Sequence, residues 1–312
     1  MSETIHIIED PNNAPIELVY PEALPAEDPD RVQLDLTNTP LKLYYPSVDH
    51  LNSEQFTLIR RDGFGGSDTG LLLNVNPFQS LAEIIDQKAR KSLTEEEKEV
   101  GEQLAVIKGN DLEPLIIHKF EKTFGMKTVK PSDMYVYKDF PWLKMNFDGV
   151  TGTPKQYIPV EIKVVTKRGE RHYNPGLCYY TEETGYHKMP ENFSINPNNS
   201  VITKAAQYGI PPYYYTQLQD EMMALNAPFG YLCTLWESVW KMYVYIVYAD
   251  PHTQNAIKIE GFKAWEQVMA LRRKRGLPER LFNSEASPAE SEPVASETGE
   301  FITIPGNLGT DQ

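Results

Sequence analysis

The pattern of apolar and polar positions predicts a β-hairpin near the middle of the chain. Residues 158–165 alternate between two faces and include many β-branched side chains, and a loop of Gly, Thr, Pro, Lys and Gln at 152–156 separates them from a preceding apolar run. Two such runs around a polar loop predict an antiparallel pair of strands. Because side chains alternate along a strand, Glu161 and Lys163 point to one face, and the pairing can bring Asp148 beside Glu161.

The same patterns predict further strands and several helices elsewhere in the chain. Besides the hairpin, alternation predicts strands at residues 134–138, 142–150, 231–237 and 239–248. Helical spacing, capping boxes and glycine stops mark the helices. We expect helices at residues 55–61, 68–73, 80–91, 94–108, 113–124, 212–225 and 253–275.

The hairpin would present two acids and a lysine to a common point. Asp148 and Glu161 offer carboxylate oxygens, which hard divalent cations such as Mg²⁺ prefer. An ion of this kind activates water for phosphodiester hydrolysis, and Lys163 could orient that water or steady the developing charge. The alternative interpretation is an exposed strand face that carries an ordinary Glu/Lys pair.

A glycine-rich turn precedes the helix predicted at 68–73. Gly63, Gly65 and Gly66 predict a tight turn into Ser67, which we expect to be the N-cap of that helix. Backbone N–H groups at such a turn suit a phosphate, so the turn is a candidate anion site. A purely structural turn is the alternative.

The net charge of −14 is concentrated at the two ends of the chain. Residues 1–39 hold nine acidic residues and one basic residue, and residues 284–312 hold six acidic residues and no basic one. Residues 40–283 are therefore neutral and form the predicted domain. The ends are rich in Pro, Ser, Glu and Ala, and we expect most of each to be a disordered acidic tail.

Composition excludes several classes of protein. Two cysteines, Cys178 and Cys233, provide neither a disulfide framework nor a four-cysteine metal site. No apolar run approaches the roughly 20 residues of a membrane helix, and no signal peptide is recognisable. We therefore expect a soluble cytoplasmic protein without membrane partners.

Five short motifs follow one another between about residues 55 and 250. They are Gly65-Gly66-Ser67-Asp68, Gly109-Asn110-Asp111-Leu112-Glu113-Pro114, Phe147-Asp148-Gly149-Val150, Glu161-Ile162-Lys163 and Tyr215-Thr216-Gln217-Leu218-Gln219. In this order they resemble the YqaJ-type viral recombinases, relatives of phage lambda exonuclease in the PD-(D/E)xK nuclease superfamily. The resemblance implies an α/β fold with a mixed central β-sheet flanked by helices, the restriction-endonuclease-like core.

The resemblance also implies roles for the hairpin residues and for one residue upstream. Asp148 and Glu161 would bind the metal together with the carbonyl of Ile162, and Lys163 would orient the attacking water. Glu113 would complete the metal shell, directly or through water. On its spacing alone, Glu113 could instead pair with Asn110 in a capping box at the start of a helix.

Other implied roles concern the DNA. Arg60 and Ser67 match residues that hold the 5′-phosphate of a DNA end, although Arg61 could replace Arg60. Gln217 or Gln219 would reach the scissile phosphate. Glu221 stands where the family usually has an aromatic residue, which leaves the choice between the two glutamines open.

Two basic segments have an open interpretation. Residues 166–200 form a longer link than the family pattern predicts, and we expect an inserted loop there, which either lines DNA or is an irregular surface excursion. Its relevant side chains are Arg168, Arg171, His172, Lys188, Tyr173, Tyr179, Tyr180 and Tyr186. The basic run 272–275 is either a solvated helix end or a contact to the DNA backbone.

The resemblance implies a DNA exonuclease that needs Mg²⁺, with Mn²⁺ as a substitute. It would digest linear double-stranded DNA from 5′ to 3′ and supply single strands to a single-strand annealing protein in phage recombination, as a ring-shaped trimer. Two alternatives remain open. One is a structure-selective or restriction-type endonuclease on the same fold, and the other is a non-catalytic DNA-binding assembly protein.

Overall fold

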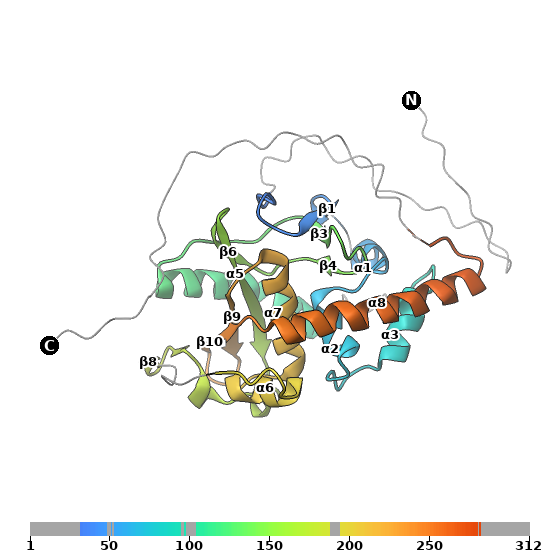
Figure 1. Ribbon diagram of the computed structural model, residues 1–312. Helices are drawn as coiled ribbons and strands as arrows, with labels where there is room; N and C mark the ends of the chain where they lie inside the picture. The colour runs from blue at the N-terminus through green and yellow to red at the C-terminus, as the bar shows by residue number, and fades with distance from the viewer. Residues whose placement is uncertain are drawn as a thin grey trace. The chain divides into compact units, whose positions relative to one another are not determined.

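The hairpin predicted from the alternating pattern lies inside a seven-stranded sheet (Figure 1). In the computed structural model, residues 32–48, 51, 53–94, 97, 104–187, 194–279 and 281 are described. Strand β6 (Gln156–Val165) pairs antiparallel with β5 (Val150–Thr153) and parallel with β9 (Phe229–Trp236). The sheet order is β2-β5-β6-β9-β10-β7-β8. The remaining strands are β2 (Thr128–Val129), β10 (Lys241–Tyr248), β7 (Tyr180–Thr181) and β8 (Gly185–Tyr186).

A second, three-stranded sheet has the order β1-β3-β4. Its strands are β1 (Leu41–Tyr45), β3 (Met134–Tyr137) and β4 (Lys144–Met145). The continuous strand predicted at 142–150 is wrong, because the chain is in a ladder only at β4 and again from Val150. Phe147 is buried in the segment between β4 and β5, where the chain passes from the three-stranded sheet to the seven-stranded sheet. Asp148 is consequently held just before β5, outside the ladder.

Helices flank the sheet as predicted. Helix α7 (Pro212–Leu225) packs on β6 and β9 and also contacts α2, α6 and α8 (Figure 1). Its buried Leu218 and Met222 join the apolar core that runs through the sheet. The other helices are α1 (Ser53–Arg60), α2 (Thr69–Leu72), α3 (Leu81–Lys88), α5 (Leu104–Phe124), α6 (Val201–Tyr208) and α8 (Pro251–Lys274), with 3-10 turns η2 (Gly66–Asp68), η4 (Glu170–His172) and η5 (Pro175–Leu177).

Helix α5 differs from its prediction. Separate helices were expected on either side of Asn110, but the helix runs without a break through Pro114. A proline inside a helix costs about 3 kcal/mol, since it cannot donate to the carbonyl four residues earlier. The fully buried Ile116 and Phe120 on the next turns hold the helix in place. The capping-box alternative for Glu113 is therefore wrong, because Glu113 lies in mid-helix. Residues 98–103 lie outside the described part.

The segment 166–200 is more regular than the expected loop. Its described part adds β7 and β8 to the edge of the large sheet, through pairing of β7 with β10. The rings of Tyr179, Tyr180 and Tyr186 pack around Phe124 at the end of α5. These three tyrosines thus fix the sheet edge to a helix. Lys188 lies outside the described residues.

The packed part of the chain begins before residue 40, the expected boundary of the domain. Leu34 is buried, and its backbone N–H donates to Tyr135 Oη. The N–H of Asp35 likewise donates to Tyr157 Oη. Residues 32–39 therefore belong structurally with the domain. No helix in the described ranges is long and apolar enough to cross a membrane.

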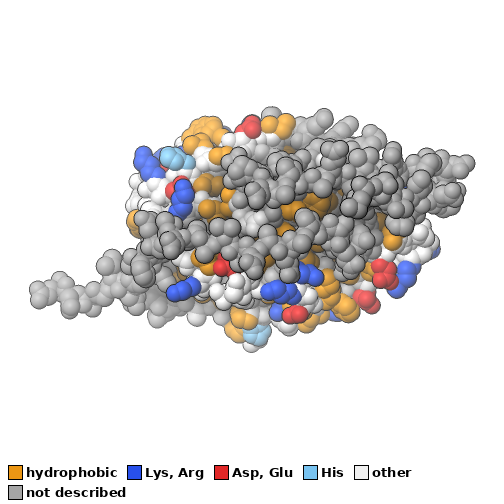
Figure 2. Space-filling model, turned by 90° about the horizontal axis from the view of Figure 1, so that it is seen from above, with side chains coloured by type: hydrophobic (Ala, Val, Ile, Leu, Met, Phe, Trp, Pro, Cys, Tyr) orange, Lys and Arg blue, Asp and Glu red, His pale blue; other side chains and the backbone are white. Residues whose placement is uncertain are grey.

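Surface charge is mixed, in line with the neutral composition of the domain. Where Figure 2 shows described side chains, lysines and arginines are interspersed with acidic residues and with apolar side chains. In the basic run at the end of α8, Arg273, Lys274 and Arg275 are exposed, as expected of a solvated helix end, whereas Arg272 is not. Arg272 is fully buried and binds Asp62 Oδ1 at 2.9 Å, and Arg275 pairs with Asp86 at 2.5 Å. Both arginines hold α8 against the N-terminal helices.

Candidate active site

The hairpin brings Asp148 and Lys163 together as the alternating pattern predicts. Asp148 Oδ2 accepts a hydrogen bond from the backbone N–H of Ile162 at 3.1 Å and lies 3.2 Å from Lys163 Nζ. Lys163 also forms a close ion pair with Glu161. The ammonium faces the ring of Tyr214 on α7, 5.6 Å from its centroid. Two acids, one lysine and an aromatic ring thus meet at one point on β6.

Glu161 is the most enclosed of these groups. Its side chain is 1 % exposed, and neither carboxylate oxygen is in a well-formed hydrogen bond with a described residue. A buried carboxylate that accepts no hydrogen bond is costly, and such groups are paired with charges or coordinate metals. Lys163 supplies part of that compensation. Glu161 retains oxygens that can accept a further positive charge.

Helix α7 contributes Gln217 and an acid that the sequence analysis did not assign to the site. Glu221 is buried and lies against Glu161. Gln217 Nε2 donates to Glu221 Oε1 at 3.3 Å. Their i, i+4 spacing puts both on the face of α7 that looks toward β6, and this spacing was the available signal. From the sequence, Glu221 was noted only as a departure from the family's aromatic residue and was given no role in the site.

The glycine-rich turn lies directly against this pair. A Cβ atom on Gly66 would stand 3.3 Å from Gln217 Cγ and 3.9 Å from Glu221 Oε1. The close approach leaves room only for glycine unless Gln217 moves. The turn and the hairpin, which are far apart in sequence, therefore border one site.

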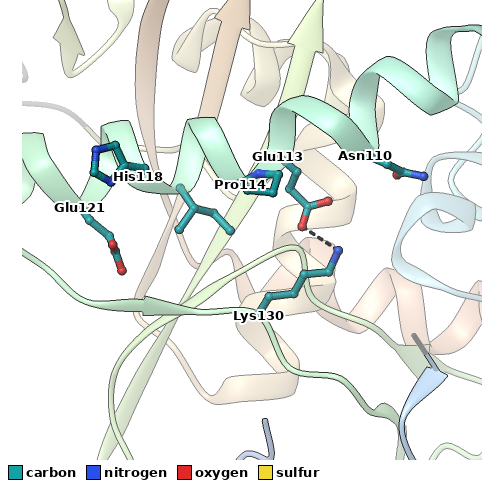
Figure 3. A pocket seen from close by; sticks show the side chains of 7 residues that line it. Asn110, Glu113, Pro114, His118, Glu121 and Lys130 are labelled. Carbon is teal, nitrogen blue, oxygen red and sulfur yellow. Dashed lines mark ion pairs between the residues drawn. The ribbon is translucent and has the colours of Figure 1, made fainter. Parts of the chain in front are cut away.

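Glu113 approaches from helix α5 and faces Lys130 (Figure 3). Glu113 Oε1 lies 2.8 Å from Lys130 Nζ, and the two line a hollow of about 310 Å³. Burial raises the pKa of Glu113, and the charge of Asp148 adds to the rise, which places Glu113 within electrostatic reach of the hairpin acids. The other lining residues are Asn110, Pro114, Ile117, His118 and Glu121.

Burial and charge act differently on the three inner acids. Burial raises the pKa of Glu161 to about 7, and the charge of Asp148 adds to that rise. Burial also raises the pKa of Glu221 well above its usual value, with the charge of Glu161 acting in the same direction. For Asp148, burial acts to raise the pKa, but the Lys163 ammonium, the Ile162 N–H and the charge of Lys130 together outweigh burial, and the pKa is lowered. The site is short of positive charge around Glu161 and Glu221.

The Arg60 and Ser67 pair also forms. Arg60 Nη2 donates to Ser67 Oγ at 2.6 Å, and the guanidinium lies over the Phe56 ring. Ser67 is exposed and is not the expected N-cap of α2, because that position is occupied by Asp68. The 3-10 turn η2 before it is capped at Gly65, whose N–H donates to Asp68 Oδ2. With no capping role, the Ser67 hydroxyl lies at the surface beside Arg60.

Two residues named as alternatives lie elsewhere. Arg61 is buried, donates to the carbonyls of Arg90 and Ser92, and pairs with Glu97 at 3.0 Å. Its guanidinium therefore stabilises the loop after α3 through these contacts. Gln219 is fully buried, with its amide N–H₂ donating to the Tyr248 carbonyl and its oxygen accepting from the Asp250 N–H. The geometry thus favours Arg60 over Arg61, and Gln217 over Gln219.

The donor set fits a hard divalent cation. Asp148, Glu161 and Glu113 offer carboxylate oxygens, the ligands that Mg²⁺ and Mn²⁺ prefer, and Glu161 has buried oxygens without good hydrogen bonds. As the side chains stand, no three His, Cys, Asp or Glu residues of the described ranges group into a metal-binding arrangement. Lys163 instead provides the positive charge between Asp148 and Glu161.

The chain matches solved structures of two exonucleases at low similarity. An alkaline exonuclease from Laribacter hongkongensis is 13% identical with a TM-score of 0.44, and the match covers 70% of this chain and 95% of that chain. A phage-related exonuclease from Haemophilus somnus is 13% identical with a TM-score of 0.40, covering 68% and 96%. Curated proteins provide no match to the sequence.

The family comparison is more extensive. Residues 55–227, more than half of the chain, match the model of the YqaJ-like viral recombinase domain. The matched range contains α1, the glycine-rich turn, Glu113, both strands of the hairpin and α7. This chain belongs to the family of YqaJ-like viral recombinase domains.

Proposed function

We propose that this chain is a DNA exonuclease that depends on Mg²⁺ or Mn²⁺ and digests linear double-stranded DNA. The observation that carries the proposal is the meeting of Asp148, Glu161 and Lys163 on β5 and β6, with Glu113 within electrostatic reach from α5. Membership of the YqaJ-like recombinase family supports the same activity.

Asp148 and Glu161 would hold the cation, together with the carbonyl of Ile162. Glu113 would complete the shell, directly or through water. A bound Mg²⁺ supplies Lewis-acid polarisation of the scissile phosphate and lowers the pKa of a coordinated water. The carboxylates fix where that charge sits, because Asp148 is itself held by the Ile162 N–H.

Lys163 and Gln217 would act on water and phosphate. Burial acts to lower the pKa of Lys163, but Asp148 and Glu161 outweigh burial and raise it well above its usual value. Lys163 is therefore a charged donor, which suits orienting the attacking water and stabilising the developing negative charge. Gln217 carries an amide donor on the facing helix and would place the phosphate.

The glycine-rich turn supports action from a 5′ end. Arg60 and Ser67 form a donor pair at the surface, and the turn between them borders Gln217 through Gly66. A guanidinium holds a terminal phosphate through two hydrogen bonds, and the terminal monoester carries more negative charge than an internal diester. We therefore assign 5′→3′ polarity to the digestion.

In its wider role, the enzyme would supply single strands to a single-strand annealing protein during phage-type recombination. A ring-shaped trimer around the DNA would keep the enzyme on its substrate. The family membership supports both statements, and the work would be done in the cytoplasm of a bacterial cell.

The decisive experiment uses three forms of one DNA sequence: a linear duplex labelled at the 5′ end, the same duplex labelled at the 3′ end, and a covalently closed circle. With Mg²⁺, early release of the 5′ label and an intact circle are expected, and EDTA should stop both reactions on linear DNA. Cleavage of the closed circle would show an endonuclease instead. Binding without cleavage of any of the three would favour a non-catalytic DNA-binding protein.

A further inference from the structure

Glu221 has no place in the proposed mechanism, yet it is among the most buried acids of the described residues. Its side chain lies on α7 against Glu161 of β6. An acid at such a position needs a partner of opposite charge or a proton. Glu221 Oε1 accepts a hydrogen bond at 3.3 Å from the amide of Gln217, which is a neutral donor.

The facing carboxylate has the same need. Glu161 is 1 % exposed and both its oxygens are buried outside any well-formed hydrogen bond. Lys163 pairs with Glu161, but it also pairs with Asp148 and so serves two acids. When all three carboxylates are ionised, a single ammonium leaves the site with an excess of negative charge.

A cation on the α7 side of Glu161 would satisfy both carboxylates. Two ionised carboxylates repel each other, and a proton shared between Glu161 and Glu221 is what relieves that repulsion without a cation. Gly66 has no side chain to fill the space beside Glu221 Oε1. Gln217 fixes the carboxylate of Glu221 from its own helix, as outer hydrogen bonds commonly do for metal ligands.

We propose that Glu221 is a fourth carboxylate ligand of the divalent cation site, which binds from α7 opposite Asp148 and shares the cation with Glu161. This inference rests on the proposed metal-dependent nuclease activity and adds a ligand to it. Helix α7 then carries both a metal ligand, Glu221, and a phosphate-placing residue, Gln217. The cation site is closed from both the sheet side and the helix side.

The test measures Mn²⁺ binding by isothermal titration calorimetry, without DNA and without turnover. Glu221→Gln should weaken binding at least about tenfold, since even outer-shell partners of metal ligands contribute 10- to 100-fold. Glu161→Gln should weaken it at least as much. Glu266→Gln removes one acid from an exposed position on α8 and is the matched control, which should bind as wild type does.

A second variant distinguishes whether Glu221 coordinates the cation or only contributes negative charge near it. Glu221→Asp keeps the charge but withdraws the carboxylate by one methylene, so a ligand role predicts weaker Mn²⁺ binding for Asp as well as for Gln. Wild-type affinity in Glu221→Asp would overturn the ligand role. Thermal unfolding without metal should occur at an unchanged or higher temperature in Glu221→Gln, because repulsion with Glu161 is removed.

The outcomes for the two proposals differ. If Glu221→Gln binds Mn²⁺ as tightly as wild type and Glu266→Gln do, Glu221 is not a ligand, while the proposed function stands. Absence of Mn²⁺ binding by wild type would overturn the metal site itself and this inference with it. Weakened binding in both Glu221 variants, with a folded protein, would establish the fourth ligand.

Discussion

Lys163 is the residue on which the charge balance of the site depends. It contacts Asp148 and Glu161 at the same time, and its ammonium also faces Tyr214. Because the two acids raise the pKa of Lys163, its proposed contribution to the chemistry is that of a fixed donor and positive charge. Removing it affects the charge of the site and the placement of water together.

We predict that Glu161→Ala and Lys163→Ala each reduce the rate of DNA digestion by on the order of 10² or more, because each removes a group that acts on the reacting phosphate. The measurement is the initial rate of nucleotide release from linear duplex DNA with Mg²⁺. Thermal unfolding should show that both variants are folded, and Glu266→Gln serves as the control for rate. Near-normal digestion by folded Glu161→Ala would remove Glu161 from the mechanism.

Asp220 offers a test of stability rather than activity. It is fully buried, accepts a hydrogen bond from Tyr137 Oη at 2.8 Å and has a second oxygen without a hydrogen bond among the described residues. Burial raises its pKa from 3.8 to about 7. Between these values the folded state holds a proton that the unfolded state has lost, so this group's contribution to stability falls as pH rises from about 4 to 7.

Asp220→Asn removes that titration. We expect the variant to gain free energy of unfolding relative to wild type as pH rises from 5 to 8, because only the wild type must bury a charge at the higher pH. Urea denaturation of both proteins at the two pH values measures the difference. A difference that stays constant with pH would show that Asp220 does not titrate in this range.

Some site residues followed from the sequence because their position depends on local geometry alone. Glu161 and Lys163 lie two residues apart on a strand, which fixes them to one face, and strand pairing brought Asp148 to the same point. The choice between Gln217 and Gln219 could not be made in this way. Helix α7 is buried over nearly its whole surface, so its pattern does not reveal which side faces β6.

At the scale of elements, the turn between α1 and α2 would connect the proposed binding of a DNA end to the hairpin. Arg60 ends α1, Ser67 lies in η2, and Gly66 between them touches Gln217 of α7. A terminal phosphate held by the first two residues would therefore be bound next to the site that cleaves the strand. This arrangement motivates a test of substrate preference.

Arg60→Ala should reduce the preference for 5′-phosphorylated over 5′-hydroxyl duplex ends, while slower digestion continues because the hairpin acids are untouched. Initial rates on the two substrates, for wild type and variant, give the preference as a ratio. Arg273→Ala removes a guanidinium from an exposed part of α8 and should leave the ratio unchanged. If Arg60→Ala also leaves it unchanged, the end phosphate binds elsewhere, with Arg168 and Arg171 the next residues to test.

Helices and strands were predictable where the hydrophobic pattern is strong. Their predicted boundaries were wrong where tertiary contacts override that pattern. The helix at 212–225 and the strands that became β9 and β10 agree with prediction to within a few residues. Pro114 suggested a helix start, but the apolar stripe of α5 carries the helix through it. In the sequence, Arg61 was a candidate phosphate ligand because it is next to Arg60. Its actual partners, the Arg90 carbonyl and Glu97, lie about 30 residues away, and no local pattern predicts that contact.

At the scale of the whole molecule, the acidic ends differ from the neutral domain in composition. The part of the chain that packs into the domain nevertheless begins at residue 32, before the compositional boundary. Leu34 is buried against the domain, and Asn38 donates to the Pro154 carbonyl beside the hairpin. The segment 32–39 thus contacts the loop of the hairpin that carries the proposed active site. The compositional boundary at residue 40 and the structural boundary at residue 32 differ by eight residues.

Two truncations distinguish these boundaries. Removal of residues 1–31 and 284–312 should leave cooperative unfolding intact, with little change in the free energy of unfolding. Removal of residues 1–39 should lower that free energy by about 1.5–3 kcal/mol for the burial of Leu34 alone. Chemical denaturation of both proteins checks this. Equal stability of the two would show that residues 32–39 contribute nothing to the domain.

The pairing of acids with lysines in the site has a consequence for folding in the absence of metal. Lys163 compensates Asp148 and Glu161, and Lys130 compensates Glu113, so most of the site's charge is balanced from within the chain. Folding therefore need not wait for a cation, in contrast to small zinc domains that are unfolded without their metal. Protein purified in EDTA should already show a single cooperative melting transition. Divalent ions should then raise the melting temperature only as their concentration exceeds the dissociation constant.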